Sequence, residues 1–499
     1  MKTTSIDHIP ESERKGVLWT GSGVHVIAGG VKKVHTEIVG NITHGGMIIK
    51  LAGNQAVEDF SIQLDVYLMH VPDNAVSLST EKSEDSFRLG LKTPKNIGFQ
   101  KRIRAFWLIT IPDNWLQPER LSACLCNSSI VGLDSLRSLS FGQIDLRTSN
   151  EFIKFETLTV QDLTLTTSNG TVEAANVNAK DIKVETSNAG IKGNLSAAEE
   201  IKLKTSNAPI EATTNAVYTN ITTSNGRIAG TFTSAKLTSL QTSSGEVTAR
   251  IQSPKIKVTT SNGAVTGLYE GDDVNIRTSN SKIKSLKATG NEIRISTSNG
   301  KIEGEYTAHK SISLKTSNAT VESTCLVDGK SGEINVETSN GGITGSYQAP
   351  NGEVSLYTSK CKIKPDKLIA KRARLTTTHS SIRGERLVIG DSLRAVTTHS
   401  AIEVDVELDE GDHKIDIFAE TSHARVDILV PNILVGPFNL TTSHSKIEVK
   451  APNELDIVLD KNDGDTKVGR KFADKSKDKG REGKIQIRTS HSPINLKYV

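Results

Sequence analysis

Histidine recurs at one repeated position in the last part of the chain, where a row of imidazoles could bind a metal or respond to pH. Five of the 12 histidines close a triplet of Thr, then Ser or Thr, then His. If the triplets stack on successive strands about 4.8 Å apart, two imidazoles do not easily close on one zinc ion, whose ligand atoms lie at about 2.1 Å. We therefore predict a structural role, with no metal and no cofactor. These residues are His379, His399, His423, His444 and His491.

Carboxylates are the other side chains that could do chemistry on a repetitive β protein. Polysaccharide lyases and hydrolases need clustered carboxylates, or a carboxylate and a base, on one outer face. The position three residues before the end of each triplet reads Thr166, Glu185, Lys204, Thr222 and so on, with alternating sign and no recurring acid pair. The sequence therefore predicts a solvated face and no catalytic residues, and a carbohydrate-active enzyme is kept as the alternative.

Two of the four cysteines, Cys124 and Cys126, lie in an alternating segment and should share one face. A zinc or redox site is conceivable there, but no neighbouring Cys or His completes a ligand set. We expect a pair of small buried residues instead.

Asparagine occupies the corresponding position earlier in the chain, where it closes a Thr-Ser-Asn triplet. Successive copies up to Asn318 are 18 or 19 residues apart, except where Ser244 replaces the Asn, and Lys360 does so once later. With the histidine copies they make seventeen repeats, which we predict to be a structural ladder. The asparagines are Asn150, Asn169, Asn188, Asn207, Asn225, Asn262, Asn280, Asn299, Asn318 and Asn340.

The residues around each triplet repeat too. Aliphatic residues stand four and, in most copies, six residues before its end, as Leu165 and Leu163 do before Asn169. Every copy carries Ile or Val three residues after it, and a small residue usually follows it directly. A period of two indicates a strand with one buried face, and Asn and Gly tolerate the backbone angles of a bend.

This pattern predicts an all-β protein, a parallel β-solenoid of about 17 coils of about 19 residues. A right-handed path is favoured for parallel crossovers. Stacked coils would let each Asn bond to the Asn of the next coil inside the bend, with the Thr two residues earlier stacking likewise.

Three segments lie outside the regular repeat. Residues 1–115 hold all three tryptophans and alternating runs, which predict an N-terminal antiparallel β cap. The solenoid would occupy 116–499, with Asn coils to about 360 and His coils from about 370. A charged loop is expected at about 453–483.

Composition narrows the partners and the location. The formal net charge of +4 is too balanced to predict nucleic acid. The sequence contains no run of 18 apolar residues, so we do not expect membrane insertion, and no signal peptide is visible. We expect a cytoplasmic protein if the chain is full-length, or an extracellular or cell-surface one if it is exported without a signal peptide.

The strand-TSNG-strand units resemble the bacterial and fungal putative-adhesin family, a β-solenoid domain of unknown function. Examples are Leu163–Val172 and Ile293–Ile302, and the segment Trp107–Pro112 is similar to the strand that leads into that family's first coil. The resemblance covers about residues 105–499 and implies the fold, with no catalytic residue to transfer. We expect a non-catalytic binding rod that presents polar faces to an unknown protein or glycan, or associates with itself.

Overall fold

The computed structural model describes residues 9, 11–27, 31–53, 59–113, 115, 118–411, 414–473 and 480–499. Strand makes up 64% of it and helix 3%, which confirms the all-β expectation. The fold is a parallel β-solenoid of about 15 turns, in which each turn of the chain is one rung. The chain divides into two compact units, Met1–Ala249 and Arg250–Val499.

In the first unit, antiparallel strands close one end of the parallel stack. The strand β5 (Phe60–Met69) pairs antiparallel with β1 (Val17–Leu18), β2 (Gly23–Ile27) and β8 (Arg102–Ile111). The strand β6 (Ser77–Lys82) pairs antiparallel with β7 (Ser86–Lys92). These strands occupy the hydrogen-bonding edges of β8 and β7, which would otherwise be free to pair with another chain.

The segment expected to be an antiparallel cap also contributes parallel rungs. The strand β3 (Lys33–Val39) pairs parallel with β7 and with β9 (Arg120–Cys124). The strand β4 (His44–Leu51) pairs parallel with β8 and with β10 (Ser128–Gly132). The rung β3–β4 therefore lies between two rungs that follow it in the chain, so stacking order and chain order differ here.

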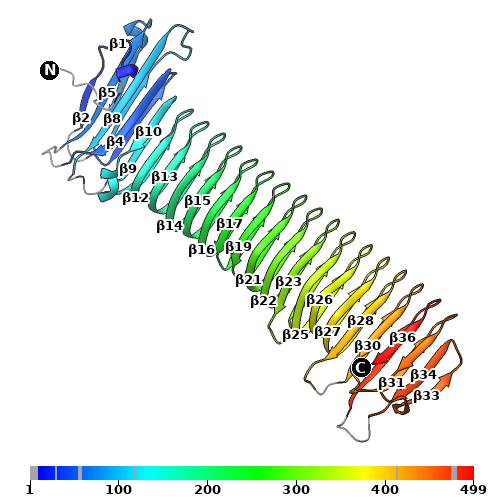
Figure 1. Cartoon of the computed structure of the whole chain (residues 1–499). Coiled ribbons are helices and arrows are strands. Elements are labelled where there is room, and N and C mark those ends of the chain that lie inside the picture. The colour runs from blue at the N-terminus through cyan, green and yellow to red at the C-terminus, as the bar shows by residue number, and fades with distance from the viewer. Residues whose placement is uncertain are drawn as a thin grey trace. The chain divides into compact units, whose positions relative to one another are not determined.

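From β11 onward the first unit stacks in chain order, and each long strand pairs parallel with the next. Figure 1 shows these strands side by side, in cyan to green. The strands are β11 (Ser140–Arg147), β12 (Ile153–Thr166), β13 (Val172–Glu185), β14 (Ile191–Lys204), β15 (Ile210–Thr222) and β16 (Ile228–Gln241). The strand β17 (Val247–Gln252) contains the division between the units, and the 3-10 turns of this unit are η1 (Glu11–Glu13), η2 (Asp73–Ala75) and η3 (Asp134–Ser138).

The second unit repeats the same rung in parallel register. Its regular strands are β18 (Lys255–Thr259), β19 (Val265–Glu270), β20 (Asp273–Arg277), β21 (Ile283–Ser296), β22 (Ile302–Lys315), β23 (Val321–Val327), β24 (Glu333–Glu337), β25 (Ile343–Tyr357), β26 (Ile363–Thr376), β27 (Ile382–Val396), β28 (Ile402–Leu408), β29 (Ile415–Glu420) and β30 (Val426–Val430).

The last rungs of the second unit are stacked out of chain order. The strand β35 (Arg481–Arg488) pairs with β29 on one side and with β31 (Leu434–Thr441) on the other. Likewise β36 (Ile494–Tyr498) lies between β30 and β32 (Ile447–Lys450). The rung β35–β36 is thus intercalated between two rungs that precede it in the chain.

A hairpin stands where a charged loop was expected at 453–483. The strands β33 (Ile457–Asn462) and β34 (Thr466–Lys471) pair antiparallel, and β34 also pairs antiparallel with β31. The short turn η4 (Glu454–Asp456) precedes them. The alternation in Thr466–Lys471 lets β34 cover the edge of β31, while Lys471 is 1% exposed and donates to Asn432 O at 3.1 Å. A high content of charge therefore did not prevent this segment from forming strands.

The interior is lined by the aliphatic residues that the repeat predicts. Leu163, Leu165 and Val172 of one rung are at most 1% exposed. Some of the larger rings inside follow a glycine with a positive φ, as Tyr306 shows. It is buried two residues after Gly304, whose φ is +147° and whose Cβ position would lie 2.1 Å from Ser285 O. Only glycine fits there, which gives the small residue five after this triplet a steric reason. Phe232 and Tyr347 follow Gly230 and Gly345 at the same position of the repeat, and Phe438 follows Gly436 at a different one.

Candidate functional site: the bend ladders and a pocket in the second unit

The seventeen predicted triplets lie in the bends that join successive strands. In each regular bend, two backbone N–H groups donate to one carbonyl of the neighbouring rung. Ser168 N and Asn169 N, for example, lie 3.1 and 2.9 Å from Ser149 O. The bend is therefore held from rung to rung by the backbone, and its side chains project from a fixed frame.

The buried residue of each bend is the threonine. Thr297 is 6% exposed, and its Oγ1 donates toward Ser281 O at 3.2 Å while accepting from Gly300 N at 3.1 Å. Equivalent threonines in all seventeen triplets are at most 6% exposed. The hydroxyl thus supplies bonds to backbone groups that water cannot reach.

The asparagines lie on the outside of the bend, not inside it as expected. All ten are exposed, and nine of the side-chain amides donate to the side-chain oxygen of the previous rung, the exception being Asn262, which follows Ser244. The Nδ2–Oδ1 distances are 2.6–2.8 Å along Asn150–Asn225 and again along Asn262–Asn340. The interior of the bend is already filled by threonine, so the amides satisfy one another at the surface.

One asparagine of the ladder was missed by the sequence analysis. Asn127, between β9 and β10, adopts φ = +49° and accepts a hydrogen bond from the Nδ2 of Asn150. Its own Nδ2 donates to Ile42 O at 2.7 Å. The preceding residues are Leu125 and Cys126 rather than Thr and Ser, which hid the repeat; an Ile three residues later, Ile130, was the remaining signal.

The histidines continue the exposed edge of the second unit as a stack of parallel rings. Ring centroids are 5.1 Å apart for His379 and His399 and 5.4 Å for His399 and His423, with planes within 5° of parallel. His491 lies next, 5.9 Å from His423 and 5.5 Å from His444. The stacking order follows the intercalated rung, so the ring of His491 separates two histidines that are consecutive in the repeat. Among the residues that the structure describes, no group of three His, Cys, Asp or Glu side chains could hold a metal ion.

The cysteines do not form the buried pair that was expected. Cys124 is exposed, and Cys126 is half-buried with its Sγ 3.3 Å from Gly40 O. Burial raises the pKa of the Cys126 thiol. The strand β9 ends at Cys124, so the alternation that would have placed both side chains on one face stops there.

A serine, a histidine and a glutamate meet on neighbouring strands of the first unit, where Ser122 and His35 line a pocket of about 490 Å³. His35 Nδ1 lies 2.8 Å from Ser122 Oγ, and His35 Nε2 lies 3.5 Å from Glu37 Oε2. Burial lowers the pKa of His35, and the Arg88 guanidinium lowers the pKa of Glu37. Ser122 is 6% exposed and also donates to Val34 O at 3.3 Å, so a backbone carbonyl engages its hydroxyl. This contact favours a structural cross-strand row over a nucleophile.

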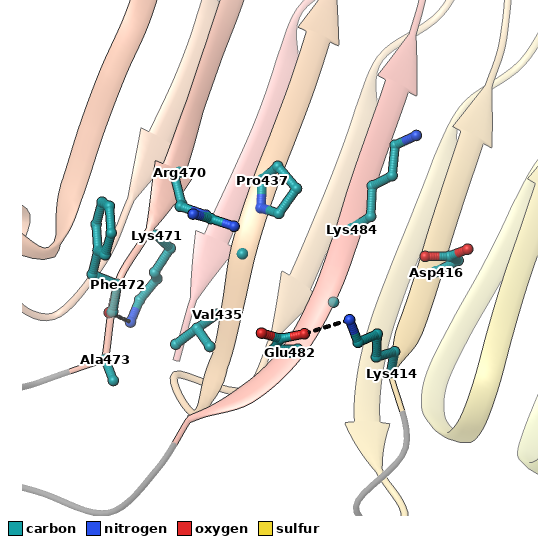
Figure 2. A pocket seen from close by; sticks show the side chains of 12 residues that line it. Lys414, Asp416, Val435, Pro437, Arg470, Lys471, Phe472, Ala473, Glu482 and Lys484 are labelled. Carbon is teal, nitrogen blue, oxygen red and sulfur yellow. Dashed lines mark hydrogen bonds and ion pairs between the residues drawn. The ribbon is translucent and has the colours of Figure 1, made fainter.

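A second pocket, of about 420 Å³, lies in the second unit between β29, β35, β31 and β34 (Figure 2). Lys414, Lys484 and Arg470 contribute positive charge, and Pro437 and Phe472 contribute apolar surface. Pockets of 300–1,000 Å³ are the usual size for small-molecule ligands. The sequence analysis did not find this pocket because its residues come together only through the intercalated rung.

Two carboxylates, Asp416 and Glu482, line the same pocket, which is where a glycoside hydrolase would need its acid pair. Lys414 Nζ lies 2.7 Å from Glu482 Oε2 (Figure 2) and lowers the pKa of that carboxyl. A general acid needs a raised pKa. Glu482 is therefore held in its ionised form and is not suited to act as a general acid.

The outer face at the position before each bend alternates in charge, as expected. Lys183 lies 3.3 Å from Glu185, and Lys315 lies 2.7 Å from Glu337. Such exposed pairs add little to stability but keep the face hydrated.

No helix among the described residues is long and apolar enough to cross a membrane. A search among proteins of curated function gave no significant match.

Two solved structures are similar to this chain. One is described as a "putative adhesin" from Bacteroides fragilis NCTC 9343, with 13% identity, a TM-score of 0.27, and coverage of 49% of this chain and 95% of that one. The other is a "putative cell adhesion protein" from Clostridium sporogenes ATCC 15579, with 12% identity, a TM-score of 0.21, and coverage of 42% and 98%.

The model of the Toastrack DUF4097 family matches residues 55–305, which is half of the chain. That range includes the rungs β8 to β16, with their buried threonines and their exposed Asn150–Asn225 ladder. The resemblance drawn from the TSNG units is confirmed, and the chain belongs to the Toastrack DUF4097 family.

Proposed function

We propose that this chain is a non-catalytic, adhesin-like scaffold that binds protein or glycan on its polar faces, or associates with itself. The observation that carries the proposal is the exposed ladder of amides and imidazoles. Its members repeat at the spacing of the rungs, and the asparagines are bonded to one another at 2.6–2.8 Å. Side chains that are already fixed lose little conformational entropy when a partner binds, which suits a recognition surface.

The alternative, a carbohydrate-active enzyme on this fold, is less well supported by the geometry. The carboxylates that share a pocket include Glu482, whose pKa is lowered by Lys414. The histidine nearest to a serine, His35, contacts a hydroxyl that a backbone carbonyl also engages. Both arrangements favour binding over proton transfer.

The test is a glycan-array and pull-down screen with the purified chain, paired with light scattering and with a reducing-sugar assay on a panel of polysaccharides. We expect saturable binding to a glycan or protein, or a defined oligomer, without hydrolysis. Hydrolysis or lyase cleavage of any polysaccharide in the panel would overturn the proposal. A monomer that binds nothing in either screen would also contradict it.

A further inference from the structure

Arginines without an acidic partner among the described residues gather on one outward face of the second unit. Arg374 on β26 lies opposite Arg394 on β27, which lies opposite Phe418 on β29. On the next rung, β35 contributes Arg488 and Lys484. We call Arg374, Arg394, Phe418, Lys484 and Arg488 the arginine face. Its four cations are exposed.

These four cations form no ion pair with any described residue. Within the described part of the chain, none of the four lies within 4 Å of an acidic oxygen, whereas Arg294 lies 2.9 Å from Asp273. Asp416 and Glu420 on β29 are the nearest acids in register, opposite Lys484 and Arg488. The Arg488 guanidinium donates to the side-chain oxygen of the neighbouring Gln486. A guanidinium group without an acidic partner remains able to bind an external anion.

Phe418 fixes the orientation of two of these guanidinium groups. The Arg394 guanidinium lies 4.4 Å from the centre of the Phe418 ring, and that of Arg488 lies 6.0 Å from it. The two arginines come from the rungs on either side of β29, so the ring is placed between them. A cation stacked on a ring loses freedom to move, which lowers the entropy cost of binding.

The arginine face continues into the pocket of the second unit. Lys484 belongs to both, and Arg470, which also has no acidic partner among the described residues, stands on the far side of the pocket beside Pro437 (Figure 2). A linear ligand that runs across the rungs would meet one or two cations on most of them. Neighbouring rungs are about 4.8 Å apart, and the ligand would end in a cavity of about 420 Å³.

We infer that the arginine face and this pocket bind an acidic polysaccharide, with the pocket holding a terminal carboxylated sugar. Carboxylates that repeat along a linear chain match cations that repeat along the rungs, and the planar guanidinium group binds a carboxylate through two hydrogen bonds. Nucleic acid fits less well, because single strands require open aromatic faces for base stacking and here guanidinium groups flank the Phe418 ring. The inference rests on the proposed binding function and names its ligand class.

The experiment measures binding of the full chain to immobilised polygalacturonate by biolayer interferometry, with neutral dextran and a single-stranded DNA oligonucleotide as comparison ligands. The variant R374Q/R394Q should weaken polygalacturonate binding about tenfold or more, as expected for the loss of two charge-assisted contacts. The F418L variant keeps every charge and should weaken binding less.

The matched control is R383Q/R386Q, which removes the same charge from β27, the strand that also holds Arg394. Arg383 and Arg386 lie outside the arginine face and are paired with two glutamates of β28, Glu403 at 3.1 Å and Glu407 at 3.5 Å. The affinity of this control variant for polygalacturonate should stay within about twofold of that of the unmodified chain. Thermal melting of each variant checks that the unit remains folded.

Three results would overturn the inference. One is equal weakening by the two double variants, which would show that net charge alone attracts the polymer. The second is tighter binding of the oligonucleotide than of polygalacturonate, and the third is no binding of polygalacturonate at all. In this last case, a positive result on the glycan array or in the pull-down screen would leave the proposed scaffold function standing.

Discussion

Threonine is the residue that each bend depends on most, because its hydroxyl is buried while the Ser and most of the Asn or His side chain remain near solvent. Thr316 shows the pattern, because its Oγ1 donates to the backbone oxygen of Gly300 in the neighbouring bend at 3.1 Å. The same side chain also contributes a methyl group to the packed interior. Neither valine nor serine can provide both functions, which explains why this position is Thr in every triplet.

Replacing Thr297 by Val should therefore destabilise the second unit. The change leaves Gly300 N without its acceptor at 3.1 Å and removes the donor to Ser281 O, which should cost about 1–3 kcal/mol. Equilibrium urea unfolding measures the difference.

Thr297→Ser keeps the hydroxyl and should cost less, and Ser298→Ala at the neighbouring exposed position should cost about 0.5 kcal/mol or less. Equal unfolding midpoints for T297V and S298A would show that the buried hydroxyl does not stabilise the bend.

Glycine at the fifth position after the bend carries a second residue-scale prediction. Gly304→Ala should destabilise the unit by about 2 kcal/mol or more, because φ is +147° and the new Cβ would lie 2.1 Å from Ser285 O. Gly342 is the control, since its nearest atom, Lys362 O, is 3.5 Å away and its φ is ordinary. Thermal melting should separate the two variants by several degrees, and coincident melting curves would contradict the steric explanation.

At the scale of elements, the repeat predicted the rung well and the order of the rungs poorly. The aliphatic residues before and after each bend determined which side chains are buried, as for Leu165 and Val172. The repeat does not predict the neighbours of β35, because β29 and β31 each precede a bend triplet and each carries the alternating buried residues of a rung. The intercalation, the pocket that it creates and the rung β3–β4 depend on long-range pairing that a local pattern does not encode.

At the scale of the molecule, each unit ends its parallel stack on antiparallel strands, β5 and β6 in one and the β33–β34 hairpin in the other. Unpaired strand edges promote association with other chains, and these strands occupy them. The two ends share this solution although their sequences differ, because the physical requirement is a partner for the backbone rather than a particular side chain.

Removing residues 481–499 tests the intercalated rung as a whole. The deletion takes away β35 and β36 and leaves β29, β30, β31 and β32 without partners on one side. We expect fast amide exchange in β31 and a lower unfolding midpoint in urea, together with oligomers in light scattering. Removal of Val499 alone, which is 51% exposed, breaks only its backbone hydrogen bonds with Val430 and Asn432 and should lower the midpoint less. An unchanged midpoint in the long deletion would show that the rung is dispensable.

The intercalated rung also constrains how the second unit can fold. Growth by adding rungs in chain order would place β31–β32 directly on β29–β30, in the site that β35–β36 occupies in the folded state. Because both candidate rungs offer the same backbone pattern, this early docking is a kinetic trap that must open before the correct rung enters. Refolding of the second unit should accordingly show a slow phase whose amplitude disappears when residues 481–499 are deleted.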